Sequence, residues 1–141
     1  MFSNSCNCAI RACVYIAQYS HENDCINVKQ IARGVDAPEY LIAKLLMKMR
    51  QHNLISSIKG VKGGFFMNSS QAKLPIIHLV QLIDGEKLLS ACVLGLPKCS
   101  SLNPCHLHAD YVHIKEAIRG VLESKTIGDL VVASRIAKAK E

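Results

Sequence analysis

Residues 27–67 read NVKQIARGVDAPEYLIAKLLMKMRQHNLISSIKGVKGGFFM, and they combine two helical patterns with a pattern typical of a β-hairpin. Asn27 can cap a short helix over residues 28–33, which is expected to end at Gly34 because glycine readily terminates helices. The sequence DAPE at residues 36–39 resembles a capping box with proline in the first turn, and it predicts a second helix that ends near residue 52. The apolar residues of this helix recur at helical spacing and are expected to face the core: Leu41, Ile42, Leu45, Leu46 and Met49.

The segment after the second helix has the residues of a β-hairpin. Residues 54–58 (LISSI) and 65–67 (FFM) favour strands, and residues 59–64 (KGVKGG) form a glycine-rich turn between them. The segment is not a phosphate-binding P-loop, because it lacks the lysine and hydroxyl pair of that motif and no helix follows it. Two helices joined by a tight turn and followed by a basic hairpin predict a winged helix-turn-helix, which inserts its second helix into the major groove of DNA.

Positive charge is concentrated in the first part of the chain. The net charge is +6, and between Glu39 and Asp84 there is no acidic residue but there are six basic ones. Ordinary solvated surfaces usually mix both signs, so this stretch favours binding to the phosphate backbone of a nucleic acid. The residues expected to contact double-stranded DNA are Tyr40, Lys44 and Lys48 on the second helix, with Lys59 and Lys62 on the hairpin.

Further helices are predicted on both sides of this unit. Residues 5–20 have an apolar helical stripe that Asn4 or Ser5 can cap, and a second stripe begins at Leu74 and ends near Gly85. A last short helix is expected to begin with the capping pair Thr126 and Asp129, before a tail at the end of the chain.

A long helix is expected to begin at Asn103-Pro104. Its apolar residues recur at alternating intervals of four and three: Leu107, Tyr111, Ile114, Ile118 and Val121. This spacing is close to that of a coiled-coil seam, and it favours packing against the same helix of a second subunit. The alternative is an apolar stripe that faces the core of a single protomer.

Metal-binding side chains gather in residues 92–108, CVLGLPKCSSLNPCHLH. Cys92, Cys99, Cys105 and His108 follow one another as C-x6-C-x5-C-x2-H. Thiolates and imidazoles hold soft metals and iron–sulfur clusters, and this set is compatible with a 2Fe–2S cluster or with tetrahedral zinc. His106 is the weaker ligand candidate, because it would point to another side of the helix than His108.

Several other classes of protein are excluded by composition. The longest uncharged apolar run, residues 88–96, is far shorter than the roughly 20 residues of a membrane span, and no signal-peptide pattern opens the chain. A cytoplasmic protein is therefore expected, in which seven cysteines indicate metal or redox chemistry rather than a disulfide framework. An enzyme with Cys105 and His108 as nucleophile and base is disfavoured, because no oxyanion hole is evident and the basic hairpin would have no role.

Three local sequences carry a resemblance to a known family: CAIRACVYIA at residues 8–17, HNLISSIKG at 52–60 and GGFF at 63–66. With the three spaced cysteines and the long helix, the chain resembles the Rrf2 family of bacterial transcription regulators, including its IscR-like and NsrR-like members, over about residues 2–133. The resemblance implies a homodimeric winged-helix protein that binds a palindromic promoter and senses cluster state, oxidants or nitric oxide.

The resemblance also implies roles for individual residues. Cys92, Cys99 and Cys105 fall on the family's cluster cysteines, and His108 falls where IscR-like members supply a histidine ligand. NsrR-like members instead take a ligand from the first helix of the partner, which would make Cys8 an alternative to His108. Tyr40, Lys44 and Lys59 fall on positions that resemble base-reading or wing contacts. The chain departs from the family at three places: the first cysteine gap is one residue longer, Ala43 replaces an acid, and Val61-Lys62 replaces the usual wing Pro or Gly.

Together these observations predict a mainly α protein with a small β-hairpin, a winged helix-turn-helix followed by a long C-terminal dimerisation helix. The expected division is a DNA-binding domain at residues 1–84, a cysteine-rich sensor loop at 85–106, the dimerisation helix and a short helix at 103–133, and a tail at 134–141. The expected function is promoter binding controlled by an iron–sulfur cluster. The alternatives are a cluster-free regulator that uses a thiol switch or a partner, and a zinc-stapled interaction module.

Overall fold

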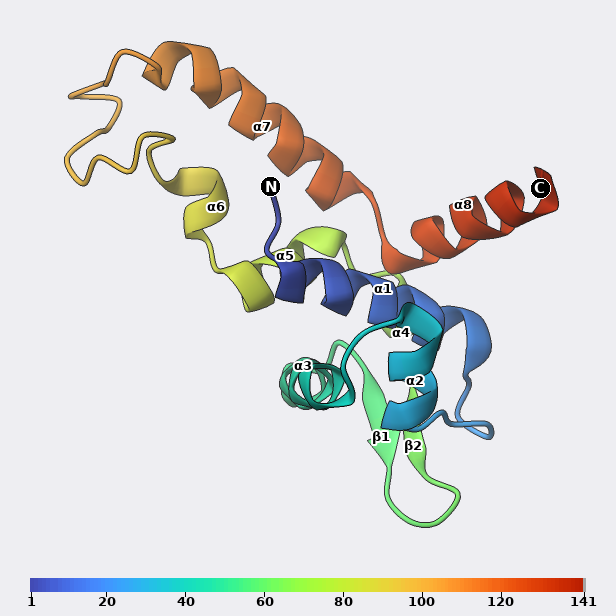
Figure 1. Cartoon of the computed structure of the whole chain (residues 1–141). Helices are drawn as coiled ribbons and strands as arrows, with labels where there is room; N and C mark the ends of the chain where they lie inside the picture. The colour runs from blue at the N-terminus through green and yellow to red at the C-terminus, as the bar shows by residue number, and fades with distance from the viewer. Residues whose placement is uncertain (141) are drawn as a thin grey trace.

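The computed structural model describes the backbone of residues 1–140 and the side chains of residues 1–133. It is mainly helical with one antiparallel hairpin, which confirms the predicted fold class (Figure 1). The elements, in chain order, are α1 (Asn4–Tyr19), α2 (Val28–Val35), α3 (Glu39–Gln51), β1 (Ser56–Ile58), β2 (Gly64–Phe66), α4 (Ser69–Ala72), α5 (Ile76–Asp84), α6 (Lys87–Ser90), α7 (His108–Ser124) and α8 (Ile127–Lys140).

Helix α1 lies at the centre of the fold and packs against α2, α3, α5 and α8. Its buried face is built from small residues together with Ile16, so neighbouring helices can approach its backbone closely. Larger side chains fill the space around it, and Ile31, Ile42, Leu46 and Ile55 are essentially inaccessible to solvent. Each such side chain contributes about 1.5–3 kcal/mol to folding through burial. The apolar stripe predicted for the second helix is buried except for Leu41, which packs at the edge of the core.

The end of α2 and the start of α3, the two helices of the helix-turn-helix, differ from the prediction. Helix α2 continues through Gly34 to Val35, because Gly34 packs against the ring of Tyr15, where a Cβ would lie 2.2 Å from Cε2. Asp36 ends the helix with φ 53° and ψ 57°, a left-handed conformation that aspartate tolerates better than most residues. Asp36 is therefore not the cap of α3. Pro38 occupies that position, and its side chain makes no capping hydrogen bond.

The hairpin is fixed to the rest of the domain through Ile26. Strands β1 and β2 pair with Ser57 opposite Phe65, and Phe65 also exchanges two backbone hydrogen bonds with Ile26, at 2.7 and 3.0 Å. This close approach requires glycine at position 64, since a Cβ there would lie 2.5 Å from the carbonyl oxygen of Ile26. The hairpin is thus anchored through its second strand to the segment between α1 and α2.

Several elements and helix ends differ from those that the sequence patterns indicated. Helices α4 and α6 are single turns, and α7 begins at His108 rather than at Asn103 because the preceding residues form turns around the cysteines. The cap of α1 is Ser3, whose hydroxyl accepts from the amide of Cys6 at 3.0 Å, and not Asn4 or Ser5. Helix α8 continues to Lys140 through most of the segment expected as a tail, and Glu141 lies outside the described residues.

Helix α7 extends away from the domain and carries the cysteine-bearing loop at its far end, at the upper left of Figure 1. Only Leu122 of its residues is buried. At its C-terminal end the chain turns into α8, which packs along α1. Within the part of the chain that is described, no helix combines the length and apolar character needed to cross a membrane.

Candidate metal centre and nucleic-acid interface

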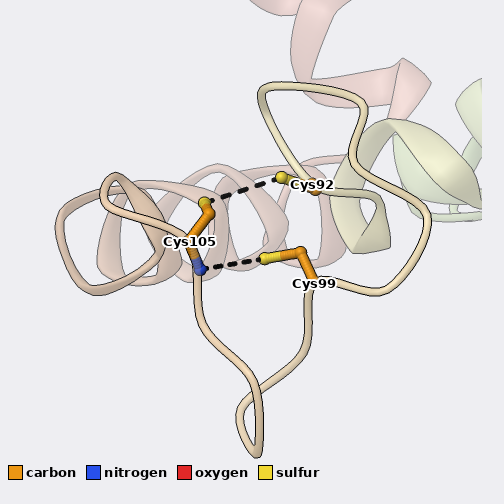
Figure 2. Close-up of side chains that lie close together, drawn as sticks. All are labelled: Cys92, Cys99 and Cys105. Carbon is orange, nitrogen blue, oxygen red and sulfur yellow. Dashed lines mark hydrogen bonds between the residues drawn. The ribbon is translucent and has the colours of Figure 1, made fainter.

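The three cysteines of the C-terminal half come together in space and form the cysteine cluster, Cys92, Cys99 and Cys105 (Figure 2). All three lie in residues 91–107, the cysteine loop between α6 and α7. Cys105 is the last of them, three residues before α7 begins. The three sulfur atoms are within 4.8 Å of one another, and those of Cys92 and Cys105 are 3.6 Å apart. All three side chains are partly exposed, so a bound metal could exchange with solvent.

His108 is placed beside this cluster as the first residue of α7. Its Nδ1 lies 3.5 Å from the sulfur of Cys99. Cys105 precedes the helix, in a turn closed by a hydrogen bond from the His108 amide to the Cys105 carbonyl at 3.1 Å. This turn brings both residues to the same side of the cysteine loop.

The sulfur atoms are surrounded by backbone N–H groups, which stabilise thiolates. The backbone N–H of Cys105 donates to the sulfur of Cys99 at 3.4 Å (Figure 2). The pKa of Cys92 is lowered to about 7, chiefly because the Leu96 amide hydrogen-bonds its sulfur. The pKa of Cys99 is raised: the Cys105 amide lowers it, but burial and the neighbouring thiols of Cys105 and Cys92 together raise it by more. The two cysteines therefore do not ionise alike when no metal is bound.

A lysine that the sequence patterns did not single out holds the start of the cysteine loop. Lys115, two turns into α7, donates a hydrogen bond from Nζ to the carbonyl oxygen of Ala91, the neighbour of Cys92. The loop is also tightened by turns, such as the hydrogen bond from the Gly95 amide to the Cys92 carbonyl at 2.9 Å. Lys115 follows His108 by seven residues, two helical turns, which is the only sequence signal that could have placed it on this side of α7.

The groups present fit an iron–sulfur cluster or a zinc ion. Three thiols within one coordination sphere, a neighbouring imidazole and an amide that donates to sulfur are the groups with which proteins hold and tune such centres. Among the residues whose side chains are described, these three cysteines form the one group of three or more metal-binding side chains this close together.

The other cysteines do not join this site. Cys8, the alternative ligand that a partner subunit would supply, is only 2% exposed, and its sulfur accepts from Arg11 at 3.4 Å. It therefore belongs to the core of its own protomer. Cys6 and Cys13 are also buried, and the pKa of each is raised to about 12, chiefly by burial.

The candidate DNA-contacting residues lie on α3 and on the hairpin, at the opposite end of the molecule from the cysteine loop (Figure 1). Tyr40 is 79% exposed, near the start of α3. The four lysines proposed as contacts are all exposed: Lys44 and Lys48 on α3, with Lys59 and Lys62 in the turn between β1 and β2. The residues on α3 and those on the hairpin are thus both exposed to solvent, as an interface with a duplex requires.

The residues predicted for a dimer interface lie along one side of α7 but differ in how exposed they are. Ile114 and Val121 are 49% and 58% exposed, and Tyr111 is 37% exposed. Leu107 is half-buried, and Ile118 packs against the core of its own protomer. The exposed part of the stripe is an apolar surface that this protomer does not cover.

Comparison with known proteins agrees with these observations. Residues 2–133 match the sequence model of the Rrf2 family, described as iron-dependent transcriptional regulators. A protein of Aquifex aeolicus named as an HTH-type transcriptional regulator is 27% identical over 133 residues, which cover 93% of this chain and 91% of that protein. The regulator IscR of Klebsiella pneumoniae is 24% identical over 90 residues, 64% of this chain, and the match spans about half of that relative, 55%.

Two solved structures share the fold. CymR, the global cysteine regulator of B. subtilis, superposes with a TM-score of 0.77 at 20% identity, covering 94% of this chain and 97% of that one. T. potens IscR superposes with a TM-score of 0.75 at 20% identity, covering 97% and 90% of the two chains. The relatives are transcriptional regulators, and the expectation that this protein is not an enzyme is confirmed on that basis.

Proposed function

Because the chain belongs to the Rrf2 family of DNA-binding transcriptional regulators, we propose that it acts as a homodimer on a palindromic operator under the control of an iron–sulfur centre. The ligands in this proposal are Cys92, Cys99, Cys105 and His108. The observation that carries it is the gathering of three sulfur atoms within 4.8 Å, with the His108 imidazole 3.5 Å from one of them. A protein with this function works on the chromosome, in the cytoplasm.

Iron is favoured over zinc for two reasons. The family is described as iron-dependent, and the cysteine spacing lacks the short C-x2-4-C pairs typical of structural zinc sites. An iron–sulfur cluster of the 2Fe–2S type would supply reactivity toward oxidants or nitric oxide. The chain's own contribution is to hold a mixed ligand set, in which the histidine is more easily displaced than a thiolate, at a partly exposed position.

DNA binding is assigned to α3 and the hairpin. In a winged helix-turn-helix the second helix enters the major groove, so we expect Tyr40 and Lys44 to lie near base edges and Lys48 near the phosphate backbone. Lys59 and Lys62, at the tip of the hairpin, are suited to phosphates at the adjacent groove. Charged contacts of this kind make the affinity strongly dependent on salt concentration.

Dimerisation is assigned to α7. Leu107, Ile114 and Val121 are spaced at seven-residue intervals and share one side of the helix, with Tyr111 and Ile118 at its border. Ile114→Glu should therefore yield a monomer in analytical ultracentrifugation. Val112→Glu is the matched control, since Val112 is an exposed apolar residue of the same helix, at 37%, but lies about 200° around the helix from Ile114. A dimer that survives Ile114→Glu would contradict this assignment.

The coupling between the metal centre and the DNA-binding elements is assigned to the cysteine loop and α7. When the four ligands hold a centre together, the loop is fixed against the first turn of α7. When they are released, the loop can move relative to that helix, and α7 then takes a different position against the domain at its other end. Such a switch requires two discrete arrangements of the loop.

A single experiment tests the proposal. The protein is purified under nitrogen, analysed for iron, acid-labile sulfide, zinc and visible absorption, and then bound to a pool of random duplexes before and after removal of the metal. Iron and sulfide in the sample, with different duplex affinities in the two states, would support it. A colourless sample without iron that binds duplexes equally under reducing and oxidising conditions would exclude it.

A second candidate, a thiol-switch regulator without a cluster, is favoured by one distance. The sulfur atoms of Cys92 and Cys105 are 3.6 Å apart, near enough for a disulfide to form after a small movement. In this case the same purification gives no iron, and duplex affinity changes on treatment with an oxidant. Stoichiometric zinc without duplex binding would instead indicate a zinc-stapled interaction module.

A further inference from the structure

Gln71 is the one buried polar residue among the side chains that the structure describes, at 9% exposure. It is the third residue of α4, the single turn that follows β2. Each atom of its side-chain amide has a partner. Nε2 donates to the carbonyl oxygen of Asn53 at 3.1 Å and to the hydroxyl of Ser56 at 3.0 Å, and Oε1 accepts from the amide of Asn68 at 3.0 Å.

The partners of Gln71 belong to the two elements proposed to bind DNA. Asn53 lies two residues after α3, in a left-handed conformation with φ 59° that redirects the chain toward the hairpin. Ser56 is the first residue of β1. One buried amide therefore joins the end of the recognition helix to the start of the wing, across a link of only four residues.

The hairpin has a second anchor of a different kind. Strand β2 is held to Ile26 by the two backbone hydrogen bonds of Phe65, which do not involve the Gln71 side chain. Strand β1 has Gln71 as its side-chain anchor, and a buried amide with satisfied partners has few alternative arrangements. Its loss would leave the Asn53 carbonyl without this partner and let β1 move relative to α3.

We propose that Gln71 is a positioning residue for DNA recognition, which fixes the hairpin at one angle to α3 so that both contact the same duplex together. It touches no DNA itself. The inference deepens the DNA-binding part of the proposed function and rests on it, and it is independent of whether the cysteine cluster holds iron, zinc or no metal.

An alternative role for Gln71 is that it only caps α4. The capping box of α2, in the same domain, provides a matched control for this alternative. Asn27 and Gln30 form the same capping box at α2 as Asn68 and Gln71 form at α4, with both reciprocal hydrogen bonds present. Gln30 is exposed, and its side chain accepts a hydrogen bond from the backbone N–H of Asn27 at 3.0 Å. Gln30→Met therefore removes the capping function without removing a link between α3 and the hairpin.

The test is a set of double-mutant cycles measured by duplex binding with the full chain. Lys59→Ala reports the wing contact and Lys44→Ala the recognition-helix contact, each expected to weaken binding by about tenfold in the otherwise native protein. In Gln71→Met the loss from Lys59→Ala should shrink below about twofold, while the loss from Lys44→Ala persists. In Gln30→Met both losses should persist. Partial unfolding of the Gln71→Met protein would reduce all of its duplex affinities together, so it could not give this selective pattern.

Three results would overturn the inference. If Lys59→Ala costs the same in Gln71→Met as in the native protein, Gln71 does not position the wing, although the DNA-binding assignment stands. If neither lysine substitution changes binding in the native protein, the DNA interface and the inference fail together. If Gln71→Met does not fold, Ser56→Ala decides, because it removes one partner and keeps the hydrogen bonds to Asn53 and Asn68. It should reduce the Lys59→Ala loss in the same way, and an undiminished loss refutes the inference.

Discussion

The backbone N–H of Ile76 donates to the carbonyl oxygen of Lys125 at 2.9 Å, and this bond joins the first residue of α5 to the C-cap residue of α7. Beside it, Pro75 and Thr126 form an isolated β-bridge. One end of α7 therefore carries His108 and the cysteine loop, and the other end docks on α5, next to the part of the chain proposed to bind DNA. Gly128 completes this junction, since a Cβ there would lie 3.3 Å from the carbonyl oxygen of Ala72 in α4.

This junction can be tested with Gly128→Val. The added side chain should push α8 away from α4 and lower the free energy of unfolding by about 1–3 kcal/mol, as overpacking usually does. We expect the iron content to be retained and the difference in duplex affinity between metal-loaded and metal-free protein to narrow. Gly120→Ala is the control, because a Cβ at position 120 meets no atom within 4 Å. An unchanged affinity difference in Gly128→Val would show that the signal does not pass through this contact.

Removal of a proposed metal ligand should abolish metal binding. Cys92→Ala and Cys99→Ala each delete a sulfur atom that lies within 4.8 Å of the other two, and we expect nearly complete loss of iron from anaerobically purified protein. His108→Ala should retain more iron than either, because three thiols remain. Cys25→Ala serves as the control, since Cys25 lies between α1 and α2 and is not part of the cysteine cluster. A cysteine variant with full iron content would remove that residue from the ligand set.

Loss of a proposed DNA contact should weaken binding in a salt-dependent way. Lys44→Ala or Lys59→Ala is expected to cost about 1–3 kcal/mol if the side chain reads a base edge, and a phosphate contact would instead reduce the salt slope by about 1. Lys125→Ala removes the same charge from the junction of α7 and α8, away from α3 and the hairpin, and should have little effect. Gel shifts over a range of salt concentrations give both quantities. Equal affinities for all three variants and the native protein would refute the assigned interface.

The stability of the hairpin should depend on glycine at position 64. Gly64→Ala places a methyl group 2.5 Å from the Ile26 carbonyl oxygen at a φ of 152°, and it should lower the free energy of unfolding by about 1–3 kcal/mol. Gly120→Ala, within α7, should raise it by about 0.5–1 kcal/mol because alanine favours the helix. Chemical denaturation of both variants measures these changes. A neutral effect of Gly64→Ala would mean that the hairpin does not pack against Ile26 in solution.

Alkylation should distinguish the cysteines by pH. The pKa values of Cys6 and Cys13 are raised to about 12, chiefly by burial, so at pH 8 both are almost entirely protonated and unreactive. The pKa of Cys92 is lowered to about 7, so in metal-free protein its thiolate predominates above that pH and should react first with iodoacetamide. Mass spectrometry of peptides after brief exposure at pH 6, 7 and 8 gives the order. Modification of Cys13 before Cys92 would contradict the assigned core.

The sequence was sufficient for the elements that local patterns encode. Apolar spacing predicted α3 and α5, and the glycines of residues 59–64 predicted the turn of the hairpin, because helices and tight turns depend on residues a few positions apart. The spacing of Cys92, Cys99 and Cys105 indicated a common ligand role, and the structure brings their sulfur atoms together.

The tertiary structure alone decided which residues serve as caps, as core residues and as connectors between elements. Gly34 lies inside a helix because Tyr15 packs over it, and Cys8 belongs to the core because Arg11 and the neighbouring helices cover it. Gln71 connects residues 15 and 18 positions earlier, Ser56 and Asn53. Contacts of this kind join segments that meet only after the helices have packed, so the spacing of residues along the chain contains no record of them.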